Sequence, residues 1–237
     1  MLPGILPQAV TDSGLILYPV CLNITGKLCI VIGGGTVARR KVHSLLADRA
    51  TVRVISPGLT KELAELAAQG EIEWRNKSYQ DDDLRGAFLV FAATDNREVQ
   101  EAICRQARSN GQLVNVADDP ECCSFQVPAT VRRGDLTLAV ATHGRSPAVA
   151  AMIRQQLEDE FGPEYQTLLE LMSMIRKHVL AGNESEEEKK NLYKNVLHRD
   201  IILWLRTGQK DRLRRHLREV LGPEFIFELE GPGQDIL

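Results

Sequence analysis

Residues 27–41 read KLCIVIGGGTVARRK, and this stretch decides the fold. Residues 28–32 form a short, almost wholly apolar run, which is typical of a strand buried on both faces of a parallel sheet. A glycine triplet follows at once, and apolar residues then recur at helical spacing from Thr36 onward. The stretch therefore predicts a strand, a tight turn and a helix, which together open a βαβ pattern.

The turn carries the pattern G-x-G-x-x-A at Gly33, Gly35 and Ala38. Gly33 permits the tight turn, Gly35 lets backbone approach a pyrophosphate, and Ala38 lets the helix pack closely on the strand. The helix N-terminus at Thr36 offers free N–H groups and a positive dipole end to phosphates. We interpret the motif as a dinucleotide-binding turn; an ordinary glycine-rich turn between strand and helix is the alternative.

Composition excludes several classes of protein. The chain has 237 residues, of which 43% are hydrophobic and 26% charged, as expected of a soluble globular protein with one large or two small domains. A net charge of −3 shows no excess of basic residues of the kind that nucleic-acid-binding proteins carry. No apolar run approaches the length of a membrane span, and residues 1–14 lack the features of a secretory signal.

The cysteines indicate a compartment. Their number is odd and no CxxC occurs, so neither a disulfide framework nor a metal site is indicated. We expect free thiols and a reducing cytoplasm. The five are Cys21, Cys29, Cys104, Cys122 and Cys123.

Hydrophobic periodicity predicts an alternation of strands and helices up to residue 120. Such an alternation is typical of a doubly wound, Rossmann-type parallel sheet of the α/β class. Ligands of these sheets bind beyond the carboxyl ends of the strands, where we expect Gly33, Gly35, Ser56, Pro57, Thr94 and Asp118 to meet. The predicted strands are 28–32, 51–55, 72–75, 87–92 and 112–117, and the predicted helices are 36–47, 59–69 and 97–109.

The residues alone leave the choice of dinucleotide open. A carboxylate at the end of the second strand normally takes the ribose hydroxyls of NAD, and Ser56 stands there instead. Arg53 lies within the strand and is not a clear clamp for the 2′-phosphate of NADP.

The pattern changes after residue 120. Two strand-like runs, 124–131 and 136–142, are joined by a short turn and read as a strand pair. Helices are predicted at 147–161 and 164–180, from Ser185, and at 209–221. We therefore predict four regions: a loose extension at 1–14, a dinucleotide-binding domain at 15–120, a strand-rich region at 121–150 and a helical domain at 151–237.

Asp118 is the best candidate for a catalytic residue. It follows a buried strand at the expected rim, where a carboxylate can take a proton from a substrate that loses a hydride. The alternative is that Asp118 or Asp119 only shapes the turn before Pro120.

A second candidate is THGRSP at residues 142–147, which joins a predicted strand to a helix. Arg145 and the helix N-terminus could hold an anionic substrate. The alternative is a helix start capped by Ser146 beside a solvated arginine.

Four blocks in this order resemble a known family across about residues 17–160. They are YPVCLNITGKLCIVIGGGTVARRKV, FLVFAATDN, VNVADDPECCSFQVPATVRRGDLTLAVAT and GRSPAVAAMIRQQLE. The chain resembles the precorrin-2 dehydrogenase/sirohydrochlorin ferrochelatase family of sirohaem biosynthesis. The later helices resemble the helical C-terminal region of that family more loosely.

The resemblance implies NAD-dependent oxidation of precorrin-2 to sirohydrochlorin, with Fe²⁺ insertion in some members, and leaves Fe²⁺ or Co²⁺ open. It implies a homodimer whose interface comes from the second region. It assigns Asp118 as general base and places cofactor contacts at Thr36, Val37, Pro57 and Gly58. Ser56-Pro57 is usual in this family despite its use of NAD, so the resemblance favours NAD.

The chain departs from the family at one position. Thr142-His143-Gly144 stands where the family usually has Thr-Gly-Gly. His143 could be a ligand, or it could merely tolerate a left-handed turn, and we favour the turn. We expect the tetrapyrrole to contact Thr142, His143, Arg145 and Ser146, and we predict no resident metal site. A chelatase without dehydrogenase activity and a non-catalytic NAD- or tetrapyrrole-binding partner are the alternatives.

Overall fold

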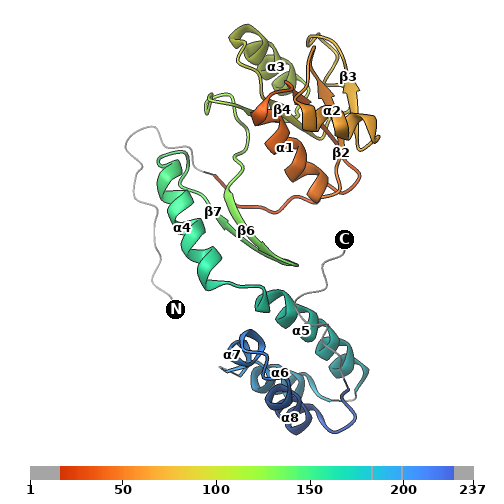
Figure 1. Ribbon diagram of the computed structural model, residues 1–237, viewed down its shortest axis with the longest axis vertical. Coiled ribbons are helices and arrows are strands. Elements are labelled where there is room, and N and C mark those ends of the chain that lie inside the picture. Colours follow the sequence, from red (N-terminus) through yellow and green to blue (C-terminus); the bar gives the residue numbers. More distant parts are fainter. Residues whose placement is uncertain (1–16, 183, 199, 227–237) are drawn as a thin grey trace. The chain divides into compact units, whose positions relative to one another are not determined.

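The computed structural model describes residues 17–182, 184–198 and 200–226 (Figure 1). The chain divides into two compact units between Val127 and Pro128, and each unit is described by itself below. The loose extension predicted at 1–14 lies outside the described residues.

The first unit is a five-stranded parallel sheet in the order β3-β2-β1-β4-β5. This order confirms the predicted doubly wound sheet, because the chain winds outward from β1 in one direction and then in the other. The elements are β1 (Leu28–Ile32), α1 (Thr36–Ala47), β2 (Thr51–Ile55), α2 (Lys61–Ala68), β3 (Ile72–Arg75), β4 (Leu89–Ala92), α3 (Arg97–Ser109) and β5 (Leu113–Val116).

Each face of this sheet has its own apolar core. On one face, Val31, Val54 and Leu63 pack with α1 and α2. On the other, Ile30 and Ile103 pack with α3, so the helices cover both faces (Figure 1). Burial on both faces explains why β1 and β4 are continuous apolar runs.

The strand register brings the carboxyl ends of four strands to one rim. Ile32 at the end of β1 pairs with Ile55 of β2 and with Ala92 of β4. Ala92 in turn pairs with Val116 of β5. The loops that follow these strands therefore start side by side, as the sequence predicts.

The second unit begins with an antiparallel pair, β6 (Ala129–Arg133) and β7 (Leu136–Val140). Helix α4 (Pro147–Glu160) lies along this pair, and four further helices form a separate apolar cluster around Leu171, Ile175 and Leu217. No helix within the described residues is long and apolar enough to cross a membrane. The four helices are α5 (Glu164–Ala181), α6 (Glu186–Val196), α7 (Ile201–Arg206) and α8 (Lys210–Leu221).

The start of the first strand in this pair differs from the prediction. The run 124–131 was expected to be a strand, but β6 begins at Ala129. Ser124 instead closes the edge of β5, since its hydroxyl accepts the Val114 N–H at 2.7 Å and its N–H donates to the Val114 carbonyl at 2.9 Å. Pro128 then has no N–H to give to a ladder.

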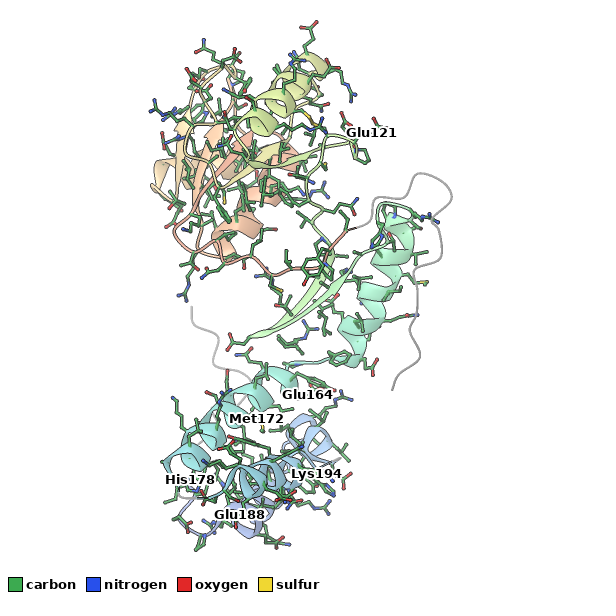
Figure 2. All side chains as sticks on the ribbon, turned by 180° about the vertical axis from the view of Figure 1, so that it is seen from behind. Glu121, Glu164, Met172, His178, Glu188 and Lys194 are labelled. Atoms are coloured by element: carbon green, nitrogen blue, oxygen red, sulfur yellow. A yellow bond between two sulfur atoms is a disulfide. The ribbon has the colours of Figure 1, made fainter. Side chains whose placement is uncertain are left out.

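Helix α7 was not predicted. It has six residues and no side-chain cap, so it lacks both the length and the boundary signals that a sequence pattern can show. Arg206 at its end donates to the Glu164 carboxylate at 2.8 and 2.6 Å. Glu164 is labelled at the start of α5 in Figure 2. A tertiary ion pair therefore helps to hold this short helix.

The expectation that all five cysteines are free is wrong for one pair. Cys104 of α3 and Cys122 form a disulfide, with Cα atoms 6.0 Å apart. They are separated by 18 residues and meet because α3 packs beside the loop after β5. Cys21, Cys29 and Cys123 are free.

Candidate active site

Backbone hydrogen bonds join the loops that leave the rim of the sheet. The Gly33 N–H donates to the Ile55 carbonyl at 2.9 Å, which ties the end of β1 to β2. The Ala93 N–H donates to Ile32 at 2.7 Å, and the Ala117 N–H donates to Ala92 at 2.9 Å. The ends of β2, β1, β4 and β5 therefore lie side by side and form one continuous rim of the sheet.

The three glycines of the turn have different surroundings. Gly33 has φ +116°, and an added Cβ would lie 2.2 Å from the Ala93 carbonyl oxygen. A Cβ on Gly34 would lie 1.9 Å from the Gly58 carbonyl oxygen. A Cβ on Gly35 would meet nothing within 4 Å. Packing thus explains the first two glycines, whereas Gly35 faces open space above the rim.

This open space lies at the N-terminus of α1. Gly35 is the N-cap, no side chain caps the helix, and its first turn contains no acidic residue. The first N–H groups of the helix therefore have no intrahelical acceptor, and no carboxylate there would repel an anion. The turn and the N–H groups of Thr36 and Val37 fit the pyrophosphate of a dinucleotide.

The Ser56 side chain is engaged within its own loop. Ser56 is 7% exposed, and its hydroxyl donates to the Gly58 carbonyl at 2.7 Å. The Trp74 indole N–H donates to the Ser56 carbonyl at 3.0 Å. The hydroxyl therefore shapes the 56–58 turn, and the parts of this loop left for a ligand are Pro57 and Gly58, both exposed.

Thr94 begins the loop between β4 and α3. Its hydroxyl accepts the Asn96 N–H at 3.3 Å, and its carbonyl accepts the Gln100 amide at 2.6 Å. Asn96 caps α3 by accepting the Val99 N–H at 3.1 Å. Thr94 thus lies at the rim in a loop held at both ends.

The two aspartates after β5 have different roles. Asp119 accepts the Cys122 N–H at 3.3 Å and pairs with Arg97 at 3.2 Å, so Asp119 shapes the turn. Asp118 is exposed and makes no hydrogen bond or ion pair with the described residues. Its φ is +61°, a left-handed conformation that is uncommon outside glycine. Of the two aspartates after β5, Asp118 is therefore the one whose carboxylate is left available at the rim.

Cys123 lies beside this loop, and its thiol is held by backbone contacts. Its sulfur accepts the Val116 N–H at 3.2 Å and contacts the Asp119 carbonyl oxygen at 3.2 Å. Burial raises the pKa of the Cys123 thiol, which keeps it protonated. A protonated, hydrogen-bonded thiol is a poor nucleophile, so we give it no role in the chemistry.

The second candidate stretch lies in the other unit, before α4. Thr142 and Ser146 form a closed turn in which the Thr142 hydroxyl donates to the Ser146 carbonyl at 3.1 Å. Ser146 caps α4 by accepting the Val149 N–H at 3.2 Å, with Pro147 as the first helical residue. His143 has φ +52°, the left-handed turn favoured from the sequence.

His143 and Arg145 are both exposed, and the described residues contain no cluster of His, Cys, Asp or Glu that could hold a metal. Contacts of these two residues and of Thr142 and Ser146 with a substrate stay a prediction. The first unit thus brings Gly33, Gly35, Thr36, Val37, Ser56, Pro57, Gly58, Thr94 and Asp118 to one rim, and the other four residues belong to the second unit.

Comparisons with known proteins agree with this geometry. Residues 20–129 match the family model described as putative NAD(P)-binding, which spans the sheet and its rim. Residues 133–160 match the model described as sirohaem biosynthesis protein, central. The chain therefore resembles sirohaem biosynthesis proteins in two consecutive segments. Its dinucleotide-binding domain comes first and the central segment, which includes α4, follows.

Relatives named siroheme synthase share much of the chain. The protein from Nitrosococcus oceani is 34% identical over 210 residues, which are 89% of this chain and 45% of the relative. The protein from Methylobacillus flagellatus is 34% identical over 203 residues, covering 86% of this chain and 44% of the relative. The chain therefore spans less than half the length of these relatives.

A solved structure matches over nearly its full length. It is named SirC, precorrin-2 dehydrogenase, and it aligns with a TM-score of 0.72 at 27% identity. The match covers 86% of this chain and 98% of that protein. The order of sheet, strand pair and helical region is thus shared with a precorrin-2 dehydrogenase.

Proposed function

We propose that this chain is an NAD-dependent dehydrogenase that oxidises precorrin-2 to sirohydrochlorin. The observation that carries the proposal is the pairing of a phosphate-binding turn, open at Gly35, with an unengaged carboxylate, Asp118, on the same rim. The NAD(P)-binding match and the likeness to a precorrin-2 dehydrogenase support it.

In this proposal some residues of the rim bind the dinucleotide and another residue transfers the proton. The turn from Gly33 to Gly35 and the N–H groups of Thr36 and Val37 hold the pyrophosphate, while Pro57, Gly58 and Thr94 border the site. A bound nicotinamide supplies the hydride acceptor. Asp118 takes the proton that leaves the substrate, and its exposed carboxylate is free to do so because Asp119 carries the structural bonds.

The test is an anaerobic assay with precorrin-2 and NAD⁺, followed by absorbance, with Asp118→Asn in parallel. Asparagine tolerates the left-handed backbone at 118, so the fold is kept while the base is lost. We expect the variant to lose about 100-fold or more in kcat with an unchanged Tm. Oxidation by wild type and variant at equal rates would contradict the role of Asp118. NAD⁺ binding without any oxidation would favour a non-catalytic partner.

The same assay addresses metal insertion. Fe²⁺ or Co²⁺ is added as a substrate after oxidation is complete. A metal-dependent spectral change above the rate without enzyme would add a chelatase step, to which Asp118 could contribute by accepting pyrrole N–H protons. A reaction that stops at sirohydrochlorin would assign insertion to another protein.

We also propose that the chain acts as a homodimer through its second unit. Each strand of the β6–β7 pair has one edge without a strand partner among the described residues. Val149 and Met152 on α4 are 41% and 54% exposed, which leaves apolar surface on the helix beside that pair. Light scattering after size exclusion tests the mass, for which twice 26.4 kDa is expected. A cytoplasmic location stays a prediction.

A further inference from the structure

One face of α3 holds the loop that carries Asp118. Four side chains recur on this helix at intervals of three or four residues, which places them on one stripe. Each contacts a different point of the loop, whose Glu121 is labelled in Figure 2. The contacts are Arg97 with the Asp119 carboxylate at 3.2 Å, Gln100 with the Ala117 carbonyl at 3.4 Å, Cys104 in a disulfide with Cys122, and Arg108 with the Glu121 carbonyl at 2.6 Å.

Gln100 differs from the two arginines of this stripe. It is 7% exposed, whereas the Arg97 side chain is 63% exposed. Its amide nitrogen donates to two carbonyls on different strand ends, Thr94 at 2.6 Å and Ala117 at 3.4 Å. One buried side chain therefore links the loop after β4 to the loop after β5.

The bond to Ala117 acts on the backbone of Asp118. The Ala117 carbonyl and the Asp118 N–H belong to one planar peptide unit, so holding the carbonyl fixes the plane. The N–H of Ala117 is held on its other side by the Ala92 carbonyl at 2.9 Å. Asp118 follows at φ +61°, a conformation that persists only where the surroundings hold it.

We propose that Gln100 is the positioning residue for Asp118. It does not touch substrate; it fixes the peptide that aims the carboxylate over the rim. This inference rests on the proposed dehydrogenase function. It adds that the rate depends on a buried amide in α3, one helix turn inside the Asn96 cap.

The experiment compares Gln100→Met with Gln106→Met. Methionine keeps the length of glutamine and removes the donor. Gln106 lies on the same helix and accepts a hydrogen bond from the Tyr79 hydroxyl, away from the loop. Both variants should lose a few degrees in Tm, because each substitution removes the hydrogen bonds of one glutamine side chain. Only Gln100→Met should lower kcat, by about 10- to 100-fold, because a misplaced base fails at the chemical step.

A conservative variant adds a readout that a purely structural role would not move. In Gln100→Glu the carboxyl faces two carbonyl oxygens and can donate only when protonated. Its kcat, relative to that of Gln100→Met at the same pH, should therefore rise about threefold or more between pH 8 and pH 6. A flat ratio, or a Gln100→Met enzyme with kcat within about twofold of wild type, would overturn the positioning role.

Hydrogen exchange separates this inference from the proposed function. The Ala117 amide, which donates to the Ala92 carbonyl, should exchange about tenfold or more faster in Gln100→Met than in wild type, and at the wild-type rate in Gln106→Met. Unchanged exchange in Gln100→Met would overturn the inference even if the wild-type chain is active. A wild-type chain that does not oxidise precorrin-2 would overturn the proposed function, and faster exchange would still support the anchoring of the loop.

Discussion

At the scale of single residues, the three glycines of the turn can be separated by their surroundings. Gly35→Ala adds a methyl group that meets no protein atom within 4 Å. We expect its Tm to stay within about 2 °C of wild type. We expect its affinity for NAD⁺ to fall about tenfold or more, because the methyl group occupies the path of the pyrophosphate. Calorimetry for binding and a thermal melt for stability measure the two effects.

Gly33→Ala is the matched contrast. Its methyl group would press on the Ala93 carbonyl and would have to accept φ +116°. We expect a loss of about 2–4 kcal/mol in the free energy of unfolding, measured in urea. Equal stabilities of the Gly33→Ala and Gly35→Ala variants would contradict this expectation. They would show that the loop at Ala93 shifts at little cost to make room for the added methyl group.

Cys29 gives a prediction about pH. Burial raises the pKa of this thiol from 9.0 to about 11. The unfolded chain therefore loses the proton first as pH rises, so the stability that Cys29 supplies is present below about pH 9 and is lost toward pH 11. Cys29→Ala should remove about 1.4 kcal/mol per pH unit from the slope of unfolding free energy in that window.

At the scale of elements, the Glu164–Arg206 pair holds α7 to the start of α5. The Glu164 side chain is 6% exposed and that of Arg206 is 51% exposed. Arg206→Met would leave a buried carboxylate without its partner. We expect a loss of about 2 kcal/mol, below the full cost of breaking a buried pair because water reaches the arginine. The midpoint of urea unfolding measures it.

The control for this pair is Arg214→Met. Arg214 pairs with Asp211 three residues away on α8, and both side chains are at least half exposed. Its loss should cost less than about 0.5 kcal/mol. A similar cost for both arginines would mean that Glu164 is solvated once Arg206 is gone.

The elements also show what a sequence pattern can predict. Leu28–Ile32, Thr36–Ala47 and Arg97–Ser109 have the bounds expected from apolar runs, caps and glycine breaks, since those signals are local. The start of β6 and the whole of α7 depend on partners distant in the chain, Val114 and Glu164. No periodicity reports such contacts.

The candidate site divides in the same way. Gly33, Gly35 and Asp118 could be predicted because a parallel sheet brings strand ends together. Gln100 could not be predicted as part of the site, because a glutamine inside an amphipathic helix looks like any polar residue until its two carbonyl partners are placed. The engagement of Ser56 within its own loop was equally hidden.

At the scale of the whole molecule, the boundary at Val127 leaves the dinucleotide-binding unit with its own core. Both apolar clusters of the sheet and the whole rim lie on its side. We therefore expect a fragment of residues 1–127 to fold and to bind NAD⁺ within about tenfold of the full chain. Circular dichroism and calorimetry test this. An unfolded fragment would show that the second unit is needed for stability.

The left-handed backbone at Asp118 affects how the activity of relatives of this chain is inferred from genome sequences. Asparagine, aspartate and glycine are the residues that best accept such a φ. A single base change converts an aspartate codon to one for asparagine or glycine. Such a replacement would leave the domain folded and its dinucleotide bound, with no proton acceptor. A relative with Asn or Gly at this position is thus a candidate for a protein that binds the dinucleotide but has lost catalysis. The residue at this single position identifies it.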